Sequence, residues 1–285
     1  MFWLLLASTF WIANLSLHLA FSNWLVLTID TPFGNFVPRD YTRLLSFLIL
    51  GLFVLYQIYR AVSGTNRLVT TLYWALWSLA ALGSVTWLVT TDIEVIHFLQ
   101  YGMLAWIIAR AVDPQREHWY TGEVILLTLL LGIIDEANQY FFLTRDNSSY
   151  LDFNDFLLNQ LGAVAGILTY YGFRLAPNTM VLPWQNLHRI LASCCLLPGA
   201  GIAIGIVTGK LRYSPDMQVP PGGLLQSTDG WLIFLQRQPG LLGSWQESFS
   251  GGSYYVLGAP EGLALLGLAL VLFAGFRSVS VRFGD

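Results

Sequence analysis

A set of polar side chains in an otherwise apolar stretch of the chain could carry out chemistry together. Imidazole and carboxyl groups act as general acids and bases, whereas phenol, amide and guanidinium groups can hold a substrate. We therefore predict that His97, Glu136 and Asp155 are candidate catalytic residues. The candidate substrate-binding residues are Tyr101, Gln139, Arg145 and Asn159.

The spacing of two pairs of these residues predicts that each pair shares one face of a helix. His97 and Tyr101 are separated by one helical turn (i, i+4), and Glu136 and Gln139 are spaced i, i+3. Asp135 is expected to point about 100° away from Glu136, because neighbouring residues on a helix are rotated by that angle.

A third polar face is predicted farther along the chain. Asp152, Asp155 and Asn159 follow the spacing i, i+3, i+7, which makes one stripe on a helix. Gly162 and Gly166 continue this stripe as a GxxxG motif, which allows another helix to approach closely. A short loop precedes this helix, so it is expected to lie antiparallel to the helix of Glu136, with the polar groups at similar depth.

The elements that position these residues are predicted to be membrane-spanning helices. The chain has 285 residues, of which 55% are hydrophobic and 11% are charged, whereas soluble domains are roughly 25% charged. A bilayer core needs about 20 mostly apolar residues per helix. We predict an all-α bundle of eight transmembrane helices, over residues 2–21, 44–62, 68–89, 93–112, 122–142, 152–173, 190–208 and 256–276.

The charged residues predict the orientation of this bundle. The loops after the second, fourth and sixth helices and the C-terminal tail carry arginines, whereas the other loops are acidic. The positive-inside rule then places both termini in the cytoplasm and the polar cluster near the outer face.

Two outward segments are longer than simple turns. Residues 22–43, which contain Pro32, Gly34 and Pro38, predict an ordered loop or a short interfacial helix. Residues 210–255 predict a cap that rests on the membrane surface, with a lid for a partner or ligand as the alternative.

Composition and motifs exclude several classes of function. The net charge of −3 argues against a nucleic-acid partner. Cys194 and Cys195 are adjacent, so they indicate neither a disulfide framework nor a zinc site. The sequence has no P-loop, Rossmann glycine motif, HExxH motif or GxSxG motif, and it indicates no particular cofactor.

The polar residues resemble the motifs of the VanZ-like family. The resemblance rests on His97 and Tyr101 in an HF-x-x-Y string, Glu136 and Gln139 in E-x-x-Q, Arg145, and Asp155, Asn159 and Gly162 in D-x-x-x-N-x-x-G. It covers about residues 93–171. Members of this family look like small multi-helix bacterial membrane proteins, and the namesake is associated with low-level resistance to glycopeptides such as teicoplanin.

The resemblance implies a VanZ-like core in a multi-pass protein of the bacterial cytoplasmic (inner) membrane. We expect N-terminal helices with an external loop over residues 1–67 and the VanZ-like core over residues 68–176. A C-terminal helix pair with the long external loop is expected over residues 177–285.

Each candidate site residue also has a structural interpretation. Arg145 with Asp155 is either an ion pair between helices or a clamp for a phosphate or carboxylate. Glu136 with Gln139 is either an interhelical hydrogen-bond network or an active centre. His97 is either a satisfied bundle histidine or a base, a metal ligand or a tetrapyrrole ligand. No spacing enforces a metal site on His97, Glu136 and Asp155, so no metal is predicted.

The polar cluster and the membrane-protein composition lead to two hypotheses for the function, and they do not decide whether the chain is an enzyme. In the first, the protein binds or processes an anionic or lipid-linked component of the cell envelope at the outer leaflet. In the second, it is a non-enzymatic accessory or structural subunit of a larger membrane complex. Gly201, Gly205 and Gly209 would serve helix contacts, inside the protein or with a partner subunit. Membrane lipids are the expected partners in both cases.

Overall fold

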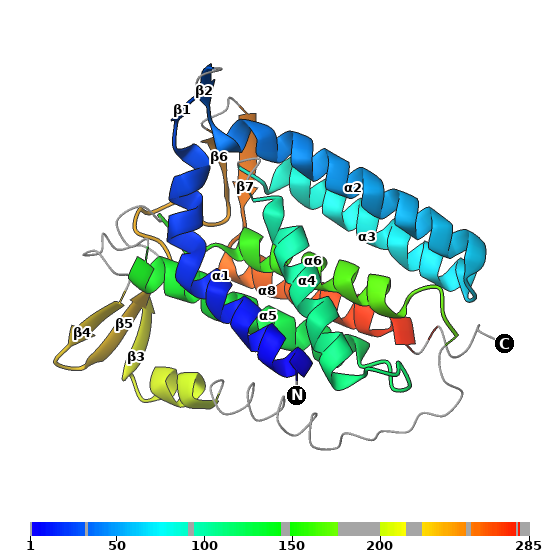
Figure 1. Ribbon diagram of the computed structural model, residues 1–285. Helices are drawn as coiled ribbons and strands as arrows, with labels where there is room; N and C mark the ends of the chain where they lie inside the picture. The colour runs from blue at the N-terminus through cyan, green and yellow to red at the C-terminus, as the bar shows by residue number, and fades with distance from the viewer. Residues whose placement is uncertain are drawn as a thin grey trace.

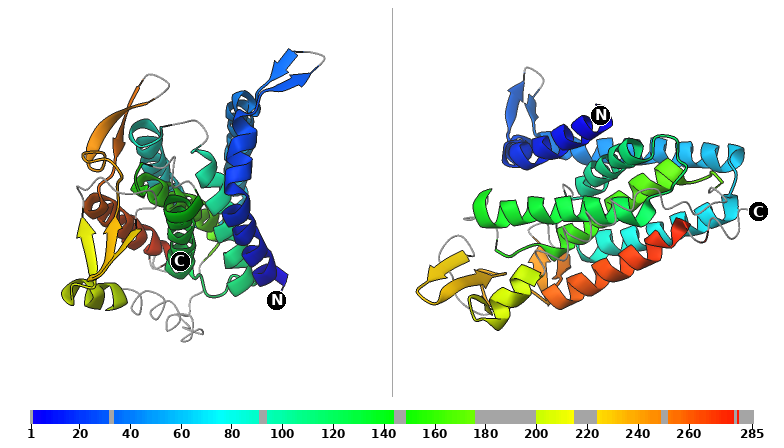
Figure 2. Two further views of the ribbon diagram at one scale, coloured as in Figure 1. Left: turned by 90° about the vertical axis from the view of Figure 1, so that its left-hand side faces the viewer. Right: turned by 90° about the horizontal axis from the view of Figure 1, so that it is seen from below.

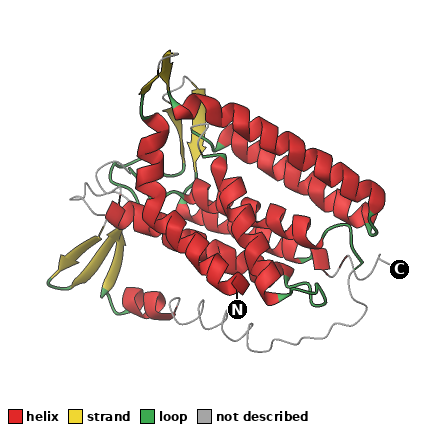
Figure 3. Ribbon diagram, viewed as in Figure 1, coloured by secondary structure: helices red, strands yellow, loops and turns green. Residues whose placement is uncertain are grey.

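The computed structural model is mostly helical, but it is not all-α as predicted (Figures 1 and 3). It describes residues 2–31, 34–90, 94–143, 149–175, 200–214, 224–248, 252–277 and 279. The helices are α1 (Phe2–Val26), α2 (Pro38–Ser63), α3 (Arg67–Trp87), α4 (Ile96–Val112), α5 (Thr121–Asn138), the π-helical turn η1 (Gln139–Leu143), α6 (Phe153–Tyr171) and α8 (Ala259–Ala274). The strands are β1 (Ile29–Thr31), β2 (Gly34–Phe36), β3 (Leu211–Ser214), β4 (Leu224–Ser227), β5 (Gly230–Phe234), β6 (Ser244–Ser248) and β7 (Gly252–Val256).

Most of the apolar runs predicted to be helical form helices at or near their expected positions. The exception is the run 190–208, of which residues 200–207 are helical and residues 190–199 lie outside the described residues. Among the described residues, two helices are long and apolar enough to cross a membrane: α3 and the continuous helix Thr121–Leu143. The prediction of eight spanning helices therefore stays a prediction.

The segment 22–43 was predicted wrongly, because it forms a β-hairpin. Helix α1 continues to Val26, and β1 then pairs antiparallel with β2, with Ile29 opposite Phe36. β-Branched and aromatic residues on both sides of a turn favour strands, so this pattern was visible in the sequence. Pro38 occupies the start of α2, where its missing N–H leaves no helical hydrogen bond unmade.

The long segment 210–255 also forms strands. Strand β5 lies between β3, to which it is parallel, and β4, to which it is antiparallel. Strands β6 and β7 form a separate antiparallel pair in which Trp245 lies opposite Tyr255. All three sheets lie at the same end of the helices (Figures 1 and 2).

Helix α6 is the centre of the helical bundle. All of its residues are buried except Asp155 and Thr169. Helices α3, α4, α5 and α8 all pack against it. A helix that is buried on every side can present polar residues only to other helices, and this is how Asp155 and Asn159 face α4 and α5.

The predicted GxxxG contact is confirmed between α6 and α4. A Cβ atom added at Gly162 would lie 2.9 Å from the carbonyl oxygens of both His97 and Phe98. A Cβ atom added at Gly166 would collide with the carbonyl oxygen of Gly102. Because both helices use glycine here, their backbones touch and the distance between their side chains is fixed.

Opposite charges gather at the two ends of the bundle. At one end, a guanidinium nitrogen of Arg60 donates to the carbonyl of Gly172 at 2.5 Å, and Arg116 lies over the ring of Tyr170. Partial burial and the like charges of Arg116 and Arg60 lower the pKa of Arg174. We call this the arginine end.

The other end, where the sheets lie, is mainly acidic, although Arg237 also lies there, over the ring of Tyr140. Burial, followed by the charge of Asp152, raises the pKa of the Tyr150 phenol. Glu94, which also contributes to this shift, accepts a hydrogen bond from the backbone N–H of Thr90 at 2.8 Å. We call this the carboxylate end.

Candidate functional site

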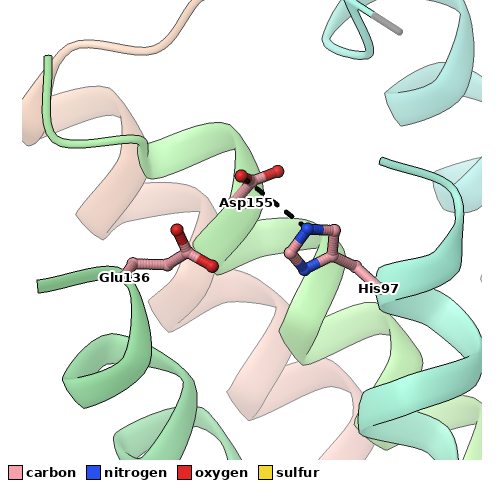
Figure 4. Close-up of side chains that lie close together, drawn as sticks. All are labelled: His97, Glu136 and Asp155. Atoms are coloured by element: carbon pink, nitrogen blue, oxygen red, sulfur yellow. Dashed lines mark ion pairs between the residues drawn. The ribbon is translucent and has the colours of Figure 1, made fainter. Parts of the chain in front are cut away.

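Three candidate residues from three helices meet at the carboxylate end. His97 lies in the first turn of α4, Glu136 is near the end of α5, and Asp155 lies in the first turn of α6. One potential ligand atom of each residue lies within 4.8 Å of those of the other two. Figure 4 shows both carboxyl groups turned toward the imidazole, whose Nε2 is 3.9 Å from Oδ2 of Asp155. His97, Glu136 and Asp155 therefore lie at the same level along the three helices, as their spacing predicted.

The imidazole of His97 is held by two neighbours that the sequence also singled out. Its Nδ1 lies 2.6 Å from Oδ1 of Asn159, and its ring is stacked with that of Tyr101 at 6.1 Å between centroids. The amide oxygen can only accept a hydrogen bond, so Nδ1 carries the proton and Nε2 faces the carboxyl groups. The i, i+4 pair therefore shares a face as predicted.

Asp135 belongs to the cluster, although it was not a sequence candidate. The phenol of Tyr101 donates to Oδ2 of Asp135 at 2.9 Å, and both side chains are buried. Asp135 is thus linked to the cluster through Tyr101. The long side chain of Tyr101 reaches Asp135 from α4. In the sequence, the signal that Asp135 belongs to the cluster was its position next to Glu136.

Asp152 does not join the polar stripe that was predicted for it. Its side chain accepts hydrogen bonds from the backbone N–H groups of Asn154, at 2.8 Å, and Asp155, at 3.3 Å. Asp152 is therefore the N-cap of α6, and the helix starts one residue later. This cap fixes the first turn of α6 and with it the position of Asp155.

Asn154 is a second residue missing from the sequence candidates. Its side-chain nitrogen donates to the carbonyls of Leu88, at 3.0 Å, and Tyr255, at 2.8 Å, and its oxygen accepts from the N–H of Leu257. These partners are distant in sequence, so no local pattern could have found them. Asn154 joins β7 to the bundle beside the site.

Two other predicted site residues lie at the end of α5. Gln139 is half-buried and is the first residue of the π-helical turn η1. Such turns are rare and occur frequently at functional sites. Arg145, which was predicted as an ion-pair partner or an anion clamp, lies outside the described residues.

The cluster has more hydrogen-bond acceptors than the described residues satisfy. Three buried carboxylate oxygens, from Asp135, Glu136 and Asp155, have no hydrogen-bond partner there. Glu136 is only 4% exposed, whereas the side chain of Asp155 is 15% exposed and gives the cluster its contact with the outside. A buried carboxylate without a partner is costly, so this arrangement is incomplete by itself.

A buried carboxyl group at the arginine end, that of Asp113, has a different environment. Its Oδ1 accepts from the N–H of Glu117 at 2.9 Å. Its Oδ2 accepts from the N–H groups of His118 and Trp119 and from the phenol of Tyr171, at 2.8–3.1 Å. Asp113 therefore fixes the turn between α4 and α5 against the end of α6.

The chain belongs to the VanZ/LLP1 family, because a family model described as VanZ/LLP1 matches residues 3–175. The match runs from α1 to the end of α6 and includes every candidate site residue. The resemblance seen in residues 93–171 is thus confirmed, and the matched region also includes the N-terminal helices. No curated protein and no solved structure matches the chain.

Proposed function

We propose that this protein is a multi-pass protein of the bacterial inner membrane whose carboxylate-end cluster binds and processes an anionic, lipid-linked component of the cell envelope. The observation that carries the proposal is the convergence of His97, Glu136 and Asp155 from three helices, with carboxylate oxygens left unpaired. General acid–base chemistry uses such groups, and a purely structural network would satisfy them.

The surface of the helices supports a membrane location. Large apolar side chains are exposed along α2, α3 and α8, where water would make them unfavourable and lipid would not. On α3 they recur along the whole helix. The exposed residues of α3 include Leu68, Leu72, Leu76, Leu79 and Leu82.

The separation of charges between the two ends supports the predicted orientation. Arginines are favoured on the cytoplasmic side, so the carboxylate end faces outward. Single cysteines test this proposal at two exposed positions, Ser63 near the arginine end and Thr228 in the β4–β5 turn. A membrane-impermeant thiol reagent added to intact cells is expected to label Thr228→Cys and spare Ser63→Cys, in a background without Cys194 and Cys195. The opposite pattern would reverse the orientation and move the site to the cytoplasmic face.

The position of the site supports a lipid-linked substrate. The cluster lies toward one end of α4, α5 and α6, and Asp155, whose side chain is 15% exposed, connects it with the outside. A substrate whose tail lies in the bilayer can bring its polar group to this depth, whereas a freely soluble molecule would have to leave water to reach it. The candidate clamp for the anionic group remains Arg145.

Lipid retention tests this function. The full chain is purified in mild detergent, and bound lipid is identified by mass spectrometry for the parent, Glu136→Gln and Tyr171→Phe. The parent and Tyr171→Phe, which changes one hydrogen bond at the arginine end, are expected to retain the same phosphate-bearing lipid. Glu136→Gln is expected to lose most of it. Equal retention by all three proteins would contradict the proposal.

The alternative function, an accessory subunit, is favoured by one observation. Most of the helical residues 200–207 are exposed and apolar, and a Cβ atom at Gly201 would meet no atom within 4 Å among the described residues. This helix face is available for a partner subunit, and the internal packing expected for Gly201 is not seen there. A protein that co-purifies in stoichiometric amount, without any retained lipid, would favour this alternative.

A further inference from the structure

We propose that His97, Glu136 and Asp155 together bind one divalent transition-metal ion of the zinc or manganese type. The inference deepens the proposed function and rests on it for the role of the ion, although metal binding is measured independently. Each of the three helices α4, α5 and α6 contributes one ligand. The donors are one imidazole nitrogen and two carboxylate oxygens.

The distances between the donor atoms suit an ion between them. Zinc ligands lie about 2.0–2.2 Å from the ion and hence roughly 3.3–3.6 Å from one another. The donor atoms here are within 4.8 Å of one another, and the Nε2–Oδ2 distance between His97 and Asp155 is 3.9 Å. Small rotations of the carboxylates of Glu136 and Asp155 would complete the contacts, because Figure 4 shows both already directed toward the imidazole.

The hydrogen bond to Asn159 sets His97 up as a ligand. Because Nδ1 donates to the amide oxygen at 2.6 Å, the neutral ring has its lone pair on Nε2. That lone pair faces a carboxylate oxygen of Asp155, and two acceptors face each other favourably only with a proton or a metal ion between them. Their separation of 3.9 Å is too long for a hydrogen bond and leaves room for an ion. Metal-binding histidines commonly donate their other N–H to an oxygen in this way, which fixes the ring and its tautomer. Asn159 is therefore a positioning residue.

The unpaired oxygens are an independent observation that points to the same ion. Oε1 of Glu136 and Oδ1 of Asp155 have no hydrogen-bond partner among the described residues. Glu136 is 4% exposed, so bulk water does not compensate for the missing partner. A cation supplies what both oxygens lack.

The donor set selects the class of ion. Imidazole favours zinc, iron and similar transition metals over magnesium and calcium, which prefer oxygen ligands alone. Three protein ligands leave at least one coordination position for water or substrate, as in catalytic zinc sites. The ion also explains how an acidic cluster can hold an anionic group, because its positive charge lies between the carboxylates and that group.

Metal binding by the full chain in detergent tests the proposal. The protein is stripped with a chelator and dialysed against Zn²⁺ or Mn²⁺, and bound metal is measured by elemental analysis. We expect one ion per chain for the parent and for the control Tyr171→Phe. His97→Ala and Asp155→Asn should reduce affinity at least 100-fold, and Asn159→Ala should reduce it 10–100-fold, the range for residues that orient a ligand.

Absence of stoichiometric metal in the parent, or unchanged affinity in His97→Ala, would overturn the proposal. Co²⁺ substitution of the parent covers the case in which a variant does not fold. An absorption band of Co²⁺ with nitrogen and oxygen ligands supports the site, and its absence overturns it. If lipid retention depends on Glu136 but the parent binds no metal, the proposed function stands and the metal site fails. If metal binds but Glu136→Gln retains lipid, the metal site stands and the proposed function fails.

Discussion

The bundle formed by α4, α5 and α6 has carboxyl groups in its interior at both of its ends, and the two sets of groups differ in their hydrogen bonding. At the arginine end, both oxygens of Asp113 accept hydrogen bonds, three from backbone N–H groups and one from Tyr171. At the carboxylate end, one oxygen each of Asp135, Glu136 and Asp155 has no partner among the described residues. Asp113, Asp135 and Glu136 are all buried, so burial alone does not distinguish the two ends.

The difference indicates which end is structural and which can bind a ligand. A carboxylate whose acceptors are all used can contribute stability and has nothing left to offer a substrate. The atoms without partners near Asp113 belong to nitrogen and hydroxyl groups of Arg116, Trp119 and Tyr120, which can donate. At the carboxylate end three carboxylate oxygens and one donor, the amide nitrogen of Asn159, have no partner among the described residues. Acceptors are therefore in excess, and a cation or further hydrogen-bond donors must complete them.

The largest effect is expected at the arginine end. Asp113→Ala leaves three backbone N–H groups and the phenol of Tyr171 without an acceptor in a buried turn. The free energy of unfolding should fall by about 4 kcal/mol, since buried donors that lose a charged partner cost 1–3 kcal/mol each and partly relax. Equilibrium unfolding in mixed micelles measures this.

Tyr171→Phe is the matched control for Asp113→Ala. It removes one of the four hydrogen bonds to the carboxylate and should cost about 1 kcal/mol. If both variants lose the same stability, the backbone hydrogen bonds to Asp113 contribute little, and the distinction between the two ends is wrong.

A smaller loss is expected where α4 contacts α6 between the two ends. In Gly166→Ala the new methyl group collides with the backbone carbonyl of Gly102, which can move only if the helices separate. The cost should be about 2–3 kcal/mol, the upper part of the usual range for overpacking, because the contact is with backbone atoms. Gly51→Ala is the control, because a Cβ atom there meets nothing within 4 Å on the exposed face of α2.

Equilibrium unfolding in mixed micelles measures the stability of both glycine variants. Gly51→Ala should be neutral or slightly stabilising, since alanine favours a helix more than glycine does. Separation of α4 from α6 also moves His97 away from Asp155, so Gly166→Ala should weaken metal binding as well. Unchanged stability in Gly166→Ala would mean that the helices are free to shift and do not fix the geometry of the site.

Much of the bundle could be predicted from the sequence, because its signals are local. The apolar runs indicated the positions of the helices, and the spacing of Gly162 and Gly166 predicted a close contact with another helix, which the structure identifies as α4. The convergence of His97, Glu136 and Asp155 followed from spacing and from an antiparallel arrangement of α5 and α6. Helix period and chain connectivity are sufficient for such inferences.

The remaining features depend on contacts that no local pattern encodes. Asp113 follows a helix and reads as an ordinary loop residue, yet its partners include Tyr171 at the end of α6. Asn154 bonds to Leu88 and Tyr255, which are far away in sequence. The strands that begin within residues 210–255 are short and are separated by segments with glycines and prolines. Their alternation of apolar and polar residues is therefore too weak to predict strands.

The smallest change in stability is expected from Glu136→Gln, and its sign is the sharpest test of the comparison. The substitution keeps the shape of the side chain but replaces the carboxyl group with a neutral amide that can also donate to Asp155. In metal-free protein the free energy of unfolding should be unchanged or higher by about 1 kcal/mol, because repulsion from Asp135 and Asp155 is removed. Glu136→Leu should be less stable than Glu136→Gln, since leucine can form no hydrogen bond with the surrounding polar groups. Binding of metal and lipid should be lost in both variants. If Glu136→Gln lowers the stability of the metal-free protein as much as Tyr171→Phe does, Glu136 is a structural hydrogen-bond acceptor like Asp113. The carboxyl groups at both ends of the bundle would then have a structural role.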